Sequence, residues 1–190
     1  MLPKEDGHFL VRLARETIED VANKHPPRKV ITYPKSLNEK LGLFCTLTKN
    51  GELRGCIGFP EATFPLIQAV VESAKAAAFS DPRFMPVTAK ELSDIEIEIS
   101  VLTKPTATAL DDIREKEDGA IIEKSSRSAL FLPQVWDELP TKDSFFSALC
   151  VKAGLRPDDW KSPGMTFYKF NVQAFEEKDF DEDKKTRTFE

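Results

Sequence analysis

The chain of 190 residues is 41% hydrophobic and 31% charged, with a formal net charge of −5, and its length suits one domain or two small lobes that share a core. The acidic balance argues against nonspecific nucleic-acid binding, which requires a basic face. No apolar run approaches the roughly 20 residues of a membrane-spanning helix, and the first residues lack the apolar segment of a signal peptide, so we expect a cytoplasmic protein without membrane contact.

Hydrophobic periodicity, interrupted by proline, glycine and capping residues, predicts helices that alternate with strands. In chain order these are an amphipathic helix over residues 10–21, a hairpin of strands 43–48 and 53–58, a helix from Pro65 to Ala77, a strand over 95–101, a hairpin of strands 120–124 and 127–132, a helix from Asp143 to Gly154, and a last strand over 166–175.

Local signals set the boundaries of these elements. Pro26-Pro27 ends the first helix, Asp81-Pro82 stops the second, and Gly154 ends the third. Thr88 and Glu91 form a capping box that opens one short turn before the third strand. That strand alternates apolar residues with glutamates, so we expect it to be half buried with an acidic outer face.

This order of elements indicates an α+β fold with a mostly antiparallel sheet and flanking helices. No linker is long enough to divide the chain, so residues 1–175 are expected to form a single domain. Residues 176–190 are almost all charged, which is typical of a mobile tail.

The richest chemistry lies in Leu53-Arg54-Gly55-Cys56-Ile57-Gly58, directly after the first hairpin turn. Asn50-Gly51 suits a type I′ turn, and in that register Cys45 faces Cys56 and Leu47 faces Arg54. Arg54, Cys56 and Gly58 then share one face of the strand. A type I turn with a bulge at Gly51 is the alternative, and it places Cys45 opposite Gly55.

An arginine beside a thiol favours the thiolate. Glycines on either side of Cys56 let a ligand or a second backbone segment approach closely. The alternative is structural, because cysteine is often buried as a small hydrophobe and a glycine in a strand often marks a bulge.

The hexapeptide resembles the signature of the AMMECR-type domain family, found as small free-standing archaeal and bacterial proteins. Further matches cover most of residues 10–175 in the family's order: Leu13-Ala14-Arg15, Gly42-Leu43-Phe44, Ala76-Ala77-Ala78, Asp81-Pro82-Arg83-Phe84, Val101-Leu102-Thr103, Asp118-Gly119, Leu132-Pro133-Gln134-Val135, Lys152-Ala153-Gly154-Leu155, and Tyr168 with Phe170. Cys45 and Cys150 stand where an aliphatic residue is expected to be acceptable, so only Cys56 is carried over as a signature thiol.

The resemblance implies a two-lobed α+β fold with the hexapeptide near a cleft between the lobes. It implies no established biochemical activity. Family members also occur beside or fused to Memo-like and radical-SAM proteins, which suggests by analogy a part in a modification pathway.

Two hypotheses of different classes follow, with a protein-interaction scaffold as a third. The first is a binding module whose cleft takes a small anionic molecule or an acidic peptide, because an arginine fork reads carboxylate or phosphate. The second is a thiol-dependent enzyme with Cys56 as nucleophile. The predicted site residues are Arg54, Gly55, Cys56, Gly58, Asp81 and Arg83. Asp81 and Arg83 are included because of the resemblance, and the alternative for them is a turn that stops the helix and is tied by an Asp–Arg pair.

Other chemistry has little support. A thiol nucleophile needs a base, and the two histidines, His8 and His25, flank the first helix as expected surface residues. Three cysteines without CxxC spacing fit a reducing compartment, and no Cys/His pair has the spacing of metal ligands. The glycine-rich phosphate-binding patterns are absent, so we expect neither a metal nor a cofactor.

Overall fold

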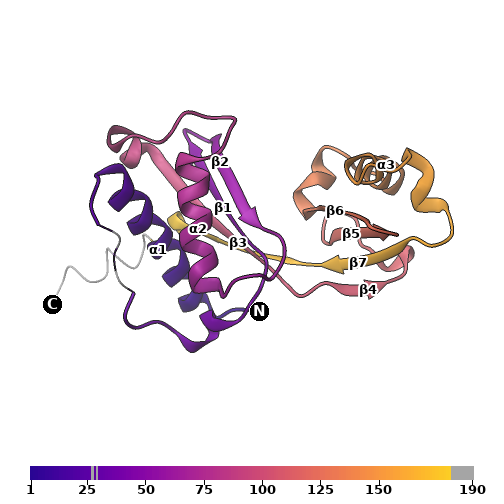
Figure 1. Cartoon of the computed structure of the whole chain (residues 1–190), viewed down its shortest axis with the longest axis horizontal. Coiled ribbons are helices and arrows are strands. Elements are labelled where there is room, and N and C mark those ends of the chain that lie inside the picture. The colour runs from indigo at the N-terminus through magenta and orange to yellow at the C-terminus, as the bar shows by residue number, and fades with distance from the viewer. Residues whose placement is uncertain (27, 29, 181–190) are drawn as a thin grey trace. The chain divides into compact units, whose positions relative to one another are not determined.

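The computed structural model describes residues 1–26, 28 and 30–180. The chain forms two compact units (Figure 1), one made of residues 1–101 together with the chain from Gln173, the other of Leu102–Val172. Each unit contains a four-stranded sheet with helical segments, and the pairings resolved residue by residue are antiparallel. The predicted α+β class is therefore confirmed.

The first unit has the strand order β2-β1-β3-β8, so β2 and β8 are its edge strands. Its strands are β1 Leu43–Lys49, β2 Glu52–Phe59, β3 Ile95–Leu102 and β8 Val172–Glu176, its helices are α1 Lys4–Ala22 and α2 Leu66–Phe79, and its 3-10 turns are η1 Lys35–Asn38, η2 Ala89–Asp94 and η6 Glu177–Phe180. Helix α2 packs against β1, β2 and α1. The core between them contains the fully buried Leu10, Ile18, Leu47 and Ile97.

The second unit has the strand order β4-β7-β5-β6. Its strands are β4 Thr106–Thr108, β5 Gly119–Lys124, β6 Arg127–Phe131 and β7 Thr166–Phe170, its helix is α3 Lys142–Lys152, and its 3-10 turns are η3 Leu110–Asp112, η4 Pro133–Asp137 and η5 Pro157–Lys161. The centre of its core is aromatic, because Trp136 stacks on Phe145 with 3.7 Å between ring centroids. Cys150 is fully buried in this core, as predicted.

The prediction of one last strand over 166–175 is wrong in one respect. The structure has two strands there, β7 and β8, and they belong to different sheets. The break falls at Asn171, whose N–H donates to Thr103 Oγ1 (2.9 Å) and whose C=O accepts from the Thr103 N–H (2.9 Å). Polar and apolar residues alternate through the break, so periodicity carried no sign of it.

The ordered chain continues beyond residue 175, where the sequence suggested that a tail begins. Glu176 completes β8, and Phe180 is buried and stacks on His8 with 4.3 Å between ring centroids. Arg15 Nε donates to the Glu177 carboxylate over 2.8 Å. Residues 181–190 of the predicted tail lie outside the described residues.

The register of the first hairpin is as predicted only beside its turn. Lys49 pairs with Glu52 and Thr48 with Leu53, but the next pair is Leu47 with Gly55. The extra residue of this β-bulge is Arg54, so both predicted pairings beyond the turn are wrong, and so is the alternative pairing of Cys45 with Gly55.

The bulge changes the neighbours of the two cysteines. Cys56 faces Thr46, and Cys45 faces Ile57. Because neighbouring residues of a strand point to opposite faces, Cys45 lies in the core on one side of the sheet and Cys56 lies on the other side. None of the helices in the described part of the chain is long and apolar enough to cross a membrane.

Candidate functional site

Cys56 lies on the edge strand β2, and both of its backbone polar groups point away from β1. Its N–H donates to Asp81 Oδ2 over 2.9 Å, and its C=O accepts from Arg83 Nη2 over 3.2 Å. Two side chains from the turn after α2 therefore occupy the outward hydrogen-bonding groups of this residue. We call Asp81 and Arg83 the edge clip.

The edge clip is also bonded to itself. Arg83 donates from Nε to Asp81 Oδ1 (3.0 Å) and from Nη2 to Asp81 Oδ2 (2.7 Å), and its backbone N–H donates to Oδ1 (3.1 Å). The Asp81 side chain is 1% exposed, whereas that of Arg83 is 52% exposed. The guanidinium of Arg83 and the N–H groups hold the pKa of Asp81 well below its usual range, so the carboxylate stays ionised.

The local sequence explains where the clip lies. Helix α2 ends at Phe79, and Pro82 cannot continue it because it has no backbone N–H to donate. The Phe84 N–H donates to the Asp81 C=O (3.2 Å), which closes a turn, and the Val87 N–H donates to the Ala78 C=O (2.8 Å), which returns the chain to the helix end. The turn is thereby fixed against the edge of β2.

The sequence predicted that Arg54 supports the Cys56 thiol, but in the structure its guanidinium pairs with Glu91. Its Nε and Nη2 donate to the two carboxylate oxygens of Glu91 over 3.2 and 3.4 Å, and its side chain is only 14% exposed. Arg54 and the Thr88 N–H together lower the pKa of Glu91 to about 2. The buried Nη1 atom of Arg54 has no hydrogen-bond partner among the described residues.

Phe84 joins the two arginines. The guanidinium of Arg83 lies 5.4 Å from the centre of its ring and that of Arg54 lies 5.9 Å from it, distances that suit cation–π contacts. In the sequence, Phe84 stands only within the Asp81-Pro82-Arg83-Phe84 motif and Glu91 only in a helix cap, so neither was predicted to be a site residue. Glu91 makes its capping bonds as well, and nothing in the local pattern marks its second partner.

The two signature glycines are required by packing. A Cβ atom on Gly55 would lie 2.2 Å from the Ala77 carbonyl oxygen of α2, and one on Gly58 would lie 2.3 Å from the Leu43 carbonyl oxygen of β1. The sequence suggested that these glycines admit either a ligand or a second backbone segment. At both positions a second backbone segment approaches closely.

Cys56 is the accessible thiol of the chain. Cys45 and Cys150 are fully buried, whereas Cys56 is partly exposed. The Thr46 hydroxyl lies 3.4 Å from its Sγ. Burial raises the pKa of the Cys45 thiol far above its usual value, which makes Cys45 unreactive in the folded chain.

Each of the two histidines has an aromatic or acidic neighbour in the structure. His8 stacks on Phe180, and His25 lies 3.9 Å from the Asp20 carboxylate. No group of three or more potential metal ligands gathers anywhere in the described part of the chain.

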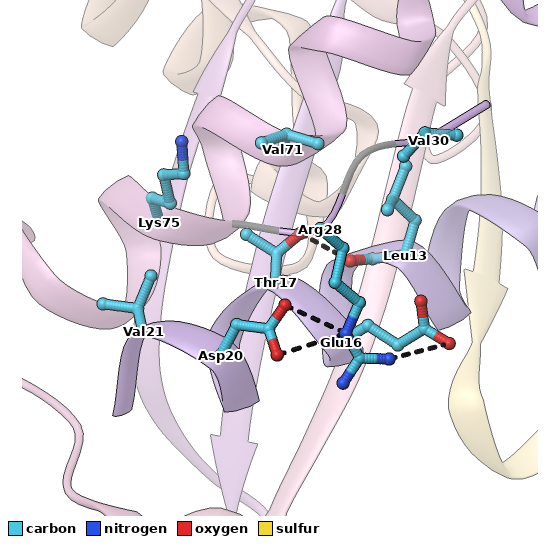
Figure 2. Close-up of a pocket in the computed structure, with 9 residues that line it drawn as sticks. All are labelled: Leu13, Glu16, Thr17, Asp20, Val21, Arg28, Val30, Val71 and Lys75. Carbon is cyan, nitrogen blue, oxygen red and sulfur yellow. Dashed lines mark hydrogen bonds and ion pairs between the residues drawn. The ribbon is translucent and has the colours of Figure 1, made fainter. Parts of the chain in front are cut away.

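The hollows in the described part of the first unit include the following two. One of about 230 Å³ lies beside Thr46, and its lining includes four glutamates and one lysine, namely Glu96, Glu98, Glu176, Glu177 and Lys178. The other is a small apolar hollow of about 50 Å³ lined by residues of α1, α2 and the segment after α1 (Figure 2), whose rim carries Arg28 bound to Asp20 and Glu16. Neither shares a lining residue with the edge clip.

Comparison with known proteins finds a matching family model and close relatives for the chain. The family model AMMECR1 matches residues 11–175. The chain is 43% identical to Protein MJ0810 of Methanocaldococcus jannaschii, covering 93% of this chain and 92% of that protein, and 44% identical to Protein MK0488 of Methanopyrus kandleri, covering 94% and 91%.

A solved structure gives the same result for the fold. The crystal structure of the uncharacterized protein PH0010 from Pyrococcus horikoshii matches with a TM-score of 0.82 and 39% identity, covering 93% of each chain. The hexapeptide, the edge clip and the two-sheet α+β fold thus occur in a chain that belongs to the AMMECR1 family.

Proposed function

We propose that the protein is a binding module that takes a carboxylate- or phosphate-bearing ligand, either a small anion or an acidic peptide, at Arg83 beside Cys56. The observation that carries this proposal is the state of Arg83, which is held by Asp81 and by the Cys56 carbonyl while 52% of its side chain faces solvent. A guanidinium fixed in place loses little conformational freedom when it binds, and it matches planar anions.

Arg83 is favoured over Arg54 because of what each guanidinium already binds. Arg54 is largely buried against Glu91, so a ligand would have to displace that carboxylate and enter a closed space. Arg83 has an exposed side and needs no such rearrangement. Because Asp81 neutralises the charge of Arg83, we expect recognition to depend on hydrogen-bond geometry more than on long-range attraction.

A thiol enzyme is the second candidate, and the exposure of Cys56 is the observation that favours it. The thiol has a hydroxyl neighbour in Thr46 at 3.4 Å. A hydroxyl is a weak base, and a nucleophilic cysteine is normally activated by a histidine or a strong positive field. The binding module therefore stands first.

The test compares two matched variants, Arg83→Lys and Arg54→Lys, each of which keeps the charge but removes the planar fork. Binding of inorganic phosphate and of a capped tri-glutamate peptide is measured by calorimetry at low salt. We expect Arg83→Lys to weaken binding by about 1–3 kcal/mol, the range for a lost charge-assisted hydrogen bond, and Arg54→Lys to have little effect.

Cys56→Ser separates the two candidates. It should leave the affinity for both probes nearly unchanged if Arg83 carries recognition. If Arg83→Lys is tolerated, and if Cys56→Ser instead abolishes a covalent adduct seen by intact-protein mass spectrometry after incubation with a lysate fraction, the binding module is wrong and the protein is a thiol enzyme.

A further inference from the structure

The outer edge of β2 has the properties of a strand-pairing surface. β2 is the terminal strand of its sheet, and alternate residues of an antiparallel edge strand turn their N–H and C=O outward. Cys56 is such a residue, since both groups meet the edge clip, and Gly58 follows it by two. Among the described residues no hydrogen bond is formed by the outward backbone groups of Gly58.

The edge clip reproduces the bonds of a neighbouring strand. Asp81 accepts from the Cys56 N–H and Arg83 donates to the Cys56 C=O, which are the two bonds that an added strand would form. The direct bonds between Arg83 and Asp81, 3.0 and 2.7 Å long, do not involve Cys56. The clip would therefore keep its own pairing when it leaves Cys56, and an incoming strand would replace the two bonds that are lost.

Exposed apolar side chains flank this edge. Leu53 is 44% exposed and directly precedes Arg54, and Met85 is 81% exposed and directly follows Phe84. The contact between Arg54 and Phe84 brings these two segments together. Most large apolar side chains in the described part of the chain are more buried than these, so the edge offers apolar contact as well as free backbone groups.

We propose that the ligand is an extended peptide with an acidic side chain that adds as a strand to the outer edge of β2 at Cys56 and Gly58. The peptide backbone takes over the two bonds to Cys56, while Arg83 stays held by Asp81 and binds the peptide carboxylate through the exposed side of its guanidinium. This inference rests on the proposed function, because it names the ligand class of the same site. Strand addition of this kind takes its affinity from backbone hydrogen bonds and its specificity from side chains.

A second copy of the chain is a less suitable occupant of this edge. Two copies that pair through β2 would be related by a two-fold axis, so each residue near the axis would meet its own counterpart. Pairing centred on Cys56 would have to displace the edge clips of both copies from their Cys56 residues, whereas a peptide displaces only one. An acidic peptide meets Arg83 with the opposite charge.

The experiment uses a phage-displayed library of linear twelve-residue peptides, selected on the full-length protein and followed by synthesis of the enriched sequences. Each peptide is then N-methylated at one backbone position at a time, which removes a strand hydrogen bond and leaves both the side chains and the protein unchanged. We expect at least a tenfold loss of affinity at alternate positions and little loss between them. The Gly58 amide should also become protected from hydrogen exchange.

The carboxylate is tested by replacing glutamate in the peptide with glutamine, which should weaken binding about tenfold to the unaltered protein and clearly less to Arg83→Lys, where the planar fork is gone. If N-methylation is harmless while the glutamine and Arg83→Lys effects remain, strand addition is wrong and the anion site alone stands. If no peptide is enriched and phosphate and tri-glutamate also fail to bind, both proposals fail. If the free protein sediments as a dimer, and if blocking the edge of β2 abolishes that dimer, the edge binds a second copy instead.

Discussion

Gly55→Ala tests whether α2 lies as close to β2 as the structure indicates. The added Cβ would lie 2.2 Å from the Ala77 carbonyl oxygen, whereas ordinary contact begins at 3.4 Å, so helix and strand must separate by about 1 Å. Overpacking of this kind costs about 1–3 kcal/mol. We expect the upper end of that range, because the obstacle is backbone and cannot rotate away.

The assay is urea unfolding followed by circular dichroism, with Gly51→Ala as control. Gly51 has φ +81° and nothing near its Cα that a Cβ would touch, so alanine there costs only the backbone strain of a positive φ, roughly 1–2 kcal/mol. Adding Ala77→Gly to Gly55→Ala should give no rescue, since the clash is with a carbonyl group. A smaller loss for Gly55→Ala than for Gly51→Ala would refute the reasoning.

Three further outcomes follow from the structure. Iodoacetamide should label Cys56 first, since the other two thiols are buried, and faster labelling of either, read by peptide mass spectrometry, would contradict the site. Phe180→Ala should cost about 3–5 kcal/mol and lower the melting temperature by several degrees, because the ring is buried against His8; an unchanged melting temperature would show that this segment does not dock. The lowered pKa of Glu91 contributes stability that is present above its unfolded pKa of about 4.3 and is lost as the pH falls toward 2. Glu91→Gln should therefore remove roughly 2 kcal/mol of the pH dependence of the free energy of unfolding, measured by urea titrations from pH 5 to 2. Parallel curves for the two proteins would argue against the Arg54 pair.

The sequence predicted the elements whose ends depend on local chemistry. Pro65 precedes α2, the capping box of Thr88 and Glu91 opens η2, and Gly154 follows the end of α3 with φ +72°. Each of these signals acts within a few residues, so a single sequence carries it.

Other features depend on residues far apart in the chain and could not be predicted. The bulge at Arg54 allows its guanidinium to reach Glu91, and the edge clip joins Cys56 to a turn 25 residues away. The break at Asn171 depends on Thr103, 68 residues earlier. Local pattern and the family resemblance therefore pointed to Arg54, Cys56, Asp81 and Arg83 as candidates, but not to which of them bind one another.

The central claim, that Arg83 beside Cys56 is the group that meets an anionic ligand, is tested most directly by NMR observation of the arginine side chains. The Nε–H signals of Arg83 and Arg54 are assigned by loss in Arg83→Lys and Arg54→Lys, and tri-glutamate peptide is then titrated into the protein. We predict that the Arg83 signal and the Cys56 amide shift together with one binding curve while the Arg54 signal stays in place. Movement of the Arg54 signal with Arg83 unaffected would contradict the account.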